Sequence, residues 1–254
     1  MKEQFLTEII IPKKIIQTWK DKNLTNNIHK ECQKQLLDLH PDYEYIFYDD
    51  NEMYAFMEKE FPQYWTAFKN LKYKIQQIDI FRLCAVYYHG GIYLDLDIFL
   101  NRKLDGMLNI GSLIFPIEFN PDYIQCKLWK NSDRFISLDC NSNKYVTLGN
   151  YGFASSQHNI ILKKMIDIIF ADYNTTTDIL ENKNQFHLQV YRTTGPDKIT
   201  ELYYKNPDIK KEIILIENTN TDKCCQFGIY GSHIMTGSWK NDDPSSLPEQ
   251  YLPQ

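Results

Sequence analysis

Two aspartates, Asp95 and Asp97, stand one residue apart in the apolar stretch GGIYLDLDIFLN, residues 90–101. A carboxylate in such surroundings is costly to bury unless a positive partner lies close to it. Side chains two residues apart on a strand point to the same face, so both carboxylates can converge on one ion. Hard divalent cations such as Mg²⁺ and Mn²⁺ prefer oxygen ligands and often share them with phosphate. The spacing therefore indicates a divalent-cation site, and the alternative is a turn with two solvated aspartates.

A second pair of charged residues precedes the aspartates. Asp79 and Arg82 are three positions apart in a segment with helical periodicity, so they share one helix face. The guanidinium of Arg82 offers a planar fork of donors that suits hydroxyls, phosphate or a neighbouring carboxylate. The alternative is a surface ion pair without a ligand. With Asp95 and Asp97 downstream, the pair favours a polar recognition site beside the cation.

Alternating strands and helices must position these residues. Strands are predicted at 11–19 and 43–49, and helices at 26–40 and from 50, with Asp50 or Asn51 as its N-cap. This order favours an α/β fold with parallel strands. A further helix is predicted before Gly90 and Gly91, which supply its stop, and a strand follows at 92–99. Ligands of open α/β sheets collect beyond the carboxyl ends of strands, where the aspartates stand.

The remainder of the chain continues the α/β pattern. Strands are predicted at 112–119 and 211–217, and helices at 158–173 and 195–206, the latter with Pro196 in its first turn. The glycines in 228–239 predict a mobile loop there, and residues from about 242 to 254 predict a loose tail. We therefore expect a single domain over residues 1–254.

Composition excludes several classes of protein. The chain has 254 residues, 43% of them hydrophobic, which is enough to build a large core. A formal net charge of −5 and no basic block argue against a nucleic-acid partner. No apolar run approaches the roughly 20 residues of a membrane helix, and six cysteines without metal spacing favour a reducing compartment. The sequence predicts a soluble, cytoplasmic protein, with a removed membrane anchor or Golgi-type targeting as the alternative.

The motifs taken together resemble those of a known family. DIFRLCAVYYHGGIYLDLD, residues 79–97, is similar to the D-x-x-R and GG-x-Y-x-D-x-D elements of the DxD-containing glycosyltransferases. That family includes enzymes related to the fungal initiating α-1,6-mannosyltransferase, the inositol-phosphoceramide mannosyltransferases and the glucosylating bacterial toxins. IPKKIIQTW (11–19) resembles its first strand, with Ile16 where the family often has His, and HIMTGSW (233–239) resembles its H-x-x-x-G-S-W. GNYGFASSQHNIIL and TTGP lie between them in the family's order.

The resemblance implies a GT-A fold, in which a mixed, mostly parallel nucleotide-binding sheet is flanked by helices. It implies a retaining, metal-dependent transfer of a hexose from a UDP- or GDP-linked donor to a hydroxyl of a glycan, glycolipid or glycoprotein. Asp95 and Asp97 would hold Mn²⁺ or Mg²⁺ on the donor diphosphate, with His233 as a further ligand. Asp79 and Arg82 would hold hydroxyls of the donor sugar.

The resemblance also implies roles around the donor. Trp19 would stack on the nucleobase, and Ser238 and Trp239 would close over the diphosphate. Asn150 or a neighbour would face the sugar, and Tyr93 is either a donor contact or a packing residue. Trp19 and His233 each have a purely structural alternative, in the core and as a hydrogen-bonded histidine respectively.

Two rival functions share the aspartate pair. One is a phosphatase of the HAD-like kind, in which the first aspartate is the nucleophile and the second the acid. That chemistry usually places the pair near the first strand, whereas here about 90 residues precede it. The other is a catalytically silent nucleotide-sugar-binding protein, which the intact set of Asp79, Arg82, Asp95 and Asp97 argues against.

Overall fold

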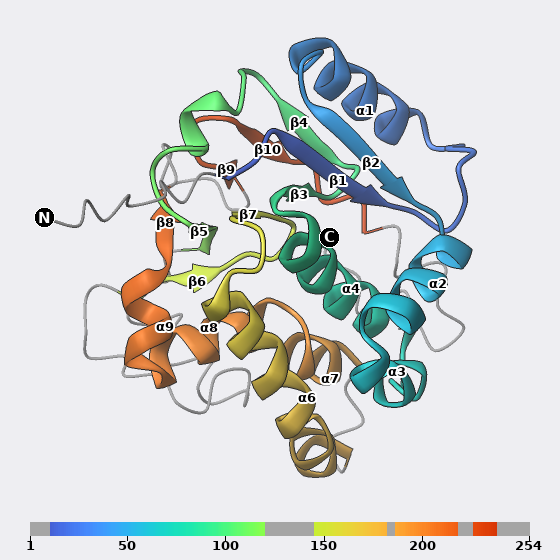
Figure 1. The fold of residues 1–254 in the computed structure, drawn as a ribbon, viewed down its shortest axis with the longest axis vertical. Helices are drawn as coiled ribbons and strands as arrows, with labels where there is room; N and C mark the ends of the chain where they lie inside the picture. The colour runs from blue at the N-terminus through green and yellow to red at the C-terminus, as the bar shows by residue number, and fades with distance from the viewer. Residues whose placement is uncertain (1–10, 120–144, 182–185, 218–225, 238–254) are drawn as a thin grey trace, which may run out of the picture.

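The computed structural model describes residues 11–119, 145–181, 186–217 and 226–237. Its centre is a mixed sheet in the order β2-β1-β3-β7-β5-β6, with β8 paired to β5. Helices α6 to α9 gather at one end of the molecule and α1 lies at the other, while α4 runs beside the sheet (Figure 1). The sheet therefore lies between helical elements, as an α/β architecture requires.

The first half of the sheet is parallel. It consists of β1 (Lys14–Thr18), β2 (Glu44–Tyr48) and β3 (Gly91–Leu94), with β1 in the middle. The helix α1 (Asn27–Leu39) connects β1 to β2, and Asn26 caps it by accepting the backbone N–H groups of Ile28 and His29. Because the three strands run in the same direction, their carboxyl ends meet at one edge of the sheet.

Three helices connect β2 to β3. They are α2 (Asp50–Glu60), α3 (Pro62–Lys69) and α4 (Lys74–His89). The N-cap of α2 is Asp49, in a capping box with Glu52, so the predicted cap at Asp50 or Asn51 is wrong by one or two positions. Eleven residues of α4 are buried, so this helix is covered on most of its circumference and its polar residues lie inside the protein.

The turn from α4 into β3 depends on glycine. Gly90 and Gly91 have φ angles of 65° and 102°, which residues with a side chain rarely adopt. A Cβ atom on Gly91 would lie 2.6 Å from the backbone oxygen of Lys14. The two glycines thus allow the chain to leave the helix and pair at once with β1.

The second half of the sheet is mixed. It contains β5 (Leu113–Phe119), β6 (Thr147–Leu148), β7 (Gly152–Ser155) and β8 (Ile214–Ile216). Strand β7 lies antiparallel to both β3 and β5, and β8 is parallel to β5. The helices that cover this half are α6 (Ile160–Glu181), α7 (Phe186–Thr193), α8 (Pro196–Lys205) and α9 (Pro207–Glu212). Helix α6 extends beyond the predicted end at residue 173. The arrangement of strands and helices confirms the predicted mixed α/β fold.

A small antiparallel sheet lies beside the main one. It consists of β4 (Ile98–Leu100), β9 (Gln226–Phe227) and β10 (Gly231–His233), in the order β4-β10-β9, and a short 3₁₀ helix, η1 (Asp105–Met107), follows β4. The predicted loop over 228–239 is therefore wrong for residues 231–233, which pair with β4. This pairing brings the C-terminal motif next to the aspartates.

The core lies on both faces of the main sheet. Along β3, Tyr93 belongs to one apolar cluster and Ile92 and Leu94 to the other, as the two-residue period of a strand requires. Phe115 and Phe153 stack on neighbouring strands with ring centroids 5.0 Å apart. Truncating a buried aromatic residue of this kind typically costs about 3–5 kcal/mol of stability. Within the described ranges, no helix combines the length and apolarity needed to cross a membrane.

Candidate active site

The two aspartates lie in a tight turn between β3 and β4. The Asp95 amide donates to the Tyr151 oxygen at 2.7 Å, and the Ile98 amide donates to the Asp95 oxygen at 3.2 Å. The Gln17 side chain, on the neighbouring strand β1, donates to the backbone oxygens of Leu94 and Asp95 at 3.2 and 3.4 Å. The backbone that carries the carboxylates is thus held from two sides, at the predicted carboxyl end of the strand.

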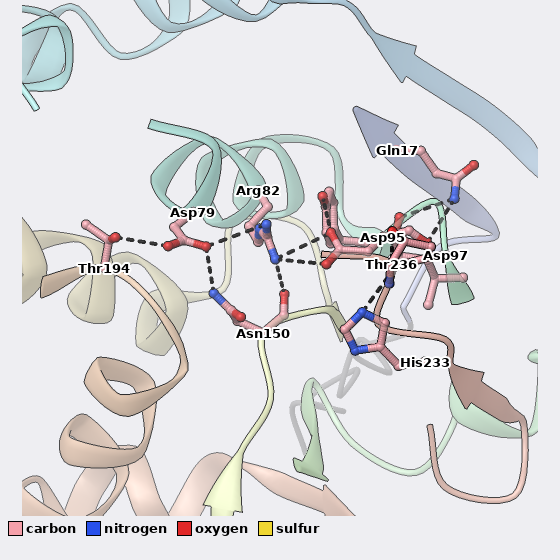
Figure 2. A network of polar contacts seen from close by, with 11 residues as sticks. Gln17, Asp79, Arg82, Asp95, Asp97, Asn150, Thr194, His233 and Thr236 are labelled. Carbon is pink, nitrogen blue, oxygen red and sulfur yellow. Dashed lines mark hydrogen bonds and ion pairs between the residues drawn. The ribbon is translucent and has the colours of Figure 1, made fainter. Parts of the chain in front are cut away.

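The Asp97 carboxylate is enclosed by the last residue of β10 and by the segment that follows this strand. Its Oδ1 lies 3.1 Å from Nε2 of His233, and its Oδ2 accepts from the amide and the hydroxyl of Thr236 at 2.8 and 2.9 Å (Figure 2). Burial opposes ionisation, but the contacts with His233 and Thr236 outweigh it and hold the pKa of Asp97 below its ordinary value. Asp97 is therefore ionised at neutral pH.

The Asp95 carboxylate has a different environment. Its side chain is 25% exposed, its Oδ1 accepts from the Tyr93 hydroxyl at 2.7 Å, and the same oxygen lies 3.4 Å from the Arg82 guanidinium. Burial raises the pKa of Asp95, and Arg82 counteracts this shift while Asp97 reinforces it. The long contact with Arg82 leaves the carboxylate oxygens accessible to another partner.

Asp79 and Arg82 form a buried polar group rather than a surface ion pair. Their side chains are 4% and 5% exposed and approach to 3.5 Å. Arg82 donates to the Asn150 backbone oxygen at 2.7 Å, and Asp79 accepts from the Asn150 amide at 2.9 Å and from the Thr194 hydroxyl at 3.0 Å. Burial raises the pKa of Asp79 to about 6, against the opposing effect of Arg82.

The site forms one continuous arrangement of polar side chains. Figure 2 shows Thr194, Asp79 and Arg82 on one side and Asp95, Asp97, Thr236 and His233 on the other, with Arg82 reaching toward both parts. Arg82 contacts Asp79 and Asp95, so it joins the two halves. The structure thus brings together four residues that the sequence predicts for one site: Asp79, Arg82, Asp95 and Asp97.

Three donor groups at this site fit a divalent cation. One ligand atom each from Asp95, Asp97 and His233 lies within 4.8 Å of the others. Carboxylate oxygens are ligands that Mn²⁺ and Mg²⁺ prefer, and an imidazole nitrogen is a common ligand of transition metals. His233 contacts Asp97 directly, at 3.1 Å between Nε2 and Oδ1.

The other residues predicted for the site differ in their exposure and in their contacts. Trp19 is partly exposed just beyond β1, with its ring edge-on to His29 at 4.7 Å between centroids. Tyr93 is 1% exposed, with the Arg82 guanidinium 4.9 Å from its ring, so it supports Asp95 from within the core. The Asn150 side chain faces Asp79. Ser238 and Trp239 lie outside the described residues.

Three contributors to the site escape prediction from the sequence. Thr194 and Thr236 stand in stretches that resemble the family but have no chemical signature of their own, although each donates to a site carboxylate. His29 is a single histidine on an amphipathic helix, and it is 1% exposed. A lone histidine gives no spacing signal, so only the tertiary structure brings it to the site.

Comparison with known proteins shows which enzymes this part of the chain is similar to. Residues 26–113, which include Asp79, Arg82, Asp95 and Asp97, match the family model described as glycosyltransferase sugar-binding region containing DXD motif. Residues 26–113 are thus similar to the sugar-binding region of glycosyltransferases that contain a DXD motif. The chain is 43% identical over 102 residues to inositol phosphoceramide mannosyltransferase 3 of Schizosaccharomyces pombe, which are 39% of this chain and 28% of that relative.

Further comparisons agree. The mannosyl phosphorylinositol ceramide synthase SUR1 of Saccharomyces cerevisiae is 41% identical over 99 residues, which are 39% of this chain and 26% of that protein. The UDP-bound glycosyltransferase domain from the YGT toxin superposes with a TM-score of 0.51 at 9% identity, covering 81% of this chain and 79% of the toxin domain. The PaToxG glycosyltransferase gives 0.50 at 17% identity, covering 80% and 74%. These structural likenesses confirm the glycosyltransferase fold predicted from the sequence.

Proposed function

We propose that this glycosyltransferase domain transfers a hexose from a nucleotide-sugar donor in a reaction that depends on a divalent cation. The observation that supports this most directly is the grouping of Asp95, Asp97 and His233 within 4.8 Å, next to the buried pair Asp79 and Arg82. Buried charged groups are costly to desolvate, so both groups of residues are better explained by a role in binding than by stability of the fold alone.

The cation half of the site would hold the donor diphosphate. A divalent cation on Asp95, Asp97 and His233 would supply positive charge that offsets the negative charge developing on the leaving diphosphate, an effect worth several kcal/mol in the barrier. Asp97 keeps its charge because Thr236 satisfies its Oδ2, and Asp95 keeps its orientation through Tyr93. Mn²⁺ and Mg²⁺ are the candidates, and the nucleotide is UDP or GDP.

The other half would hold the sugar. Arg82 is fixed by the Asn150 backbone oxygen, and Asp79 is fixed by Asn150 and Thr194, so their remaining hydrogen-bonding capacity has a defined direction. Carboxylate and guanidinium groups match the hydroxyls of a hexose. These residues would place the anomeric carbon near the cation half, and Trp19 would stack on the base at the sheet edge. Retention of configuration rests on the family resemblance.

The relatives indicate the sugar and the acceptor class to test first. Both fungal relatives carry mannosyl in their names, and inositol phosphoceramide, a glycolipid precursor, appears in the name of one. The match spans less than a third of each of them. We propose mannose as the first candidate hexose and a hydroxyl of a glycan or glycolipid as the acceptor.

A panel of nucleotide sugars tests the proposal. The purified protein should hydrolyse or transfer one donor slowly in the presence of Mn²⁺, and chelation with EDTA should stop the reaction. Asp97→Asn should abolish turnover with an unchanged circular dichroism spectrum. Release of phosphate from simple phosphoesters without donor turnover would favour a phosphatase. Calorimetric binding of a donor without any turnover would favour a silent binding protein, and either result would overturn the proposed transfer.

A further inference from the structure

A chain of hydrogen bonds connects the first helix to the aspartates. Nε2 of His29, in the first turn of α1, lies 3.3 Å from Oγ1 of Thr236, and that hydroxyl lies 2.9 Å from Oδ2 of Asp97. His29 and Thr236 are separated by 207 positions in sequence. The first helix and the segment after β10 therefore meet at a carboxylate that belongs to neither of them.

The direction of this chain follows from the chemistry of its members. The Asp97 carboxylate is ionised and accepts only, so the Thr236 hydroxyl must donate its single proton to it. With that proton donated to Asp97, Thr236 Oγ1 can only accept from the imidazole, so His29 donates from Nε2. His29 is consequently the neutral tautomer with its proton on Nε2. Its Nδ1 is buried and has no hydrogen-bond partner within the described part of the chain, as expected for a nitrogen without a proton in an apolar place.

The chain governs which Asp97 oxygen is available. Thr236 occupies Oδ2 with two bonds, from its amide and its hydroxyl, while Oδ1 faces His233. Met235, just before Thr236, has a φ of 59°, a left-handed conformation that residues with a side chain rarely adopt. Contacts from outside this segment hold such a turn: Asp97 accepts from Thr236, and His29 contacts the same hydroxyl from the other side.

The imidazole of His29 has a second neighbour. The ring of Trp19 lies edge-on to it, with centroids 4.7 Å apart and planes at 77°. His29 thus touches the aromatic ring expected to stack on the base and the threonine that holds the expected cation ligand. The two contacts use different properties of the side chain: the ring shape for Trp19 and the Nε2 proton for Thr236.

We propose that His29 is a positioning residue that locks Thr236 onto Asp97 and thereby sets the affinity of the site for its divalent cation. This inference rests on the proposed function, because it assumes that Asp97 is a cation ligand. Removing a group that orients a metal ligand typically lowers metal affinity by 10- to 100-fold. We expect a value near the lower end, about tenfold, because the amide of Thr236 still holds Oδ2.

Substitutions at position 29 separate its two contacts. His29→Phe keeps a ring against Trp19 and removes the donor, whereas His29→Gln keeps a donor near the position of Nε2 and removes the ring. Thr236→Val removes the hydroxyl with little change in shape. His40→Phe is the matched control, because His40 is equally buried but bonds to Leu36 and Leu104 away from the site.

Calorimetric titration with Mn²⁺, in the presence of GDP or UDP, gives the decisive comparison. His29→Phe and Thr236→Val should each weaken Mn²⁺ binding about tenfold, the double variant should be no weaker than Thr236→Val, and His29→Gln should restore most of the affinity. His40→Phe should bind Mn²⁺ as the wild type does, even if its melting temperature falls. Unchanged Mn²⁺ affinity in His29→Phe, or additive losses in the double variant, would overturn the inference.

A second measurement needs no metal. Long-range ¹H–¹⁵N spectra of histidine-labelled apo protein should show His29, assigned by its loss in His29→Phe, with the proton on Nε2. A proton on Nδ1, or an imidazolium at pH 7.5, would overturn the donor chain. If the wild type binds no Mn²⁺ at all, the proposed function fails and this inference with it. If the wild type binds Mn²⁺ and the variants match it, only the role of His29 fails.

Discussion

Replacing Arg82 with Met should expose the electrostatic balance of the site. Arg82 is the only cation among the described residues that contacts both Asp79 and Asp95, at 3.5 and 3.4 Å. Methionine has a similar length and no charge, so the variant leaves two carboxylates facing each other without their partner. It also leaves the Asn150 backbone oxygen without the donor that now lies 2.7 Å away.

The magnitude follows from burial. Breaking a buried ion pair by removing one member costs about 3–5 kcal/mol, because the remaining charge stays desolvated. Asp79 is 4% exposed and receives almost no screening from water, whereas Asp95 is 25% exposed and can be hydrated in part. We expect a loss of about 3–5 kcal/mol at pH 8, a large share of the 5–15 kcal/mol that holds a typical domain folded.

The dependence on pH has a definite sign. With Arg82 present the pKa of Asp79 is already raised to about 6, and without the guanidinium it rises further. An acid whose folded pKa exceeds its unfolded value of about 3.9 favours folding below that value, and this contribution disappears as pH rises through the folded pKa. The deficit of Arg82→Met should therefore be smallest near pH 4 to 5 and largest near pH 8.

Urea denaturation followed by far-UV circular dichroism at pH 5 and pH 8 measures this deficit. Adding Asp79→Asn to Arg82→Met should recover part of the loss at pH 8, because one of the unpaired charges is gone. Lys34→Met is the control, since it removes the exposed pair with Asp38 and should leave the denaturation midpoint unchanged. A deficit that is absent at pH 8, or greater at pH 5 than at pH 8, would refute the reasoning.

Three further predictions concern the cation and the turn. Mn²⁺ with a nucleoside diphosphate should raise the melting temperature of the wild type by several degrees but not that of Asp97→Asn, and equal shifts in scanning fluorimetry would remove Asp97 from the cation ligands. Tyr93→Phe should lose about 1 kcal/mol of stability with its bond to Asp95, and a titration should show weaker Mn²⁺ binding. Gly91→Ala should destabilise by about 2 kcal/mol or more in urea, because its Cβ meets the Lys14 backbone; wild-type stability would contradict the strained turn.

The sequence predicts the site-bearing half of the fold well. The helix that ends at Gly90 and the strand that delivers Asp95 have strong local signals. The structure confirms the helix and the first part of the strand, but the predicted strand 92–99 is wrong at residues 95–97, where a turn separates β3 from β4. The strand–helix–strand order at the start of the chain also predicts the parallel pairing of β1 with β2. Local pattern suffices here because each element is regular, is separated by turn residues and follows its neighbour in the chain.

The rest depends on contacts between distant segments. Strand β7 has four residues, two of them Gly152 and Ser155, and its central position between β3 and β5 comes only from pairing partners. Strand β10 contains a glycine and a serine and forms because β4 lies beside it, which overrides the loop tendency of its sequence. His29 and Thr236 come together across 207 positions, and neither has a pattern that predicts the other.

The charges at the site explain why a divalent cation suits it. Asp79, Asp95 and Asp97 converge on a region where Arg82 is the permanent cation that the described contacts provide. One guanidinium cannot balance three ionised carboxylates. Burial is the main cause that raises the pKa of Asp79 and Asp95, and a neighbouring aspartate adds to the shift of each. A divalent cation between Asp95 and Asp97 would balance the remainder, and a diphosphate could then approach a surface that would otherwise repel it. Arg82 thus neutralises part of the charge of Asp79 and Asp95, and in the proposed reaction the divalent cation would neutralise the rest.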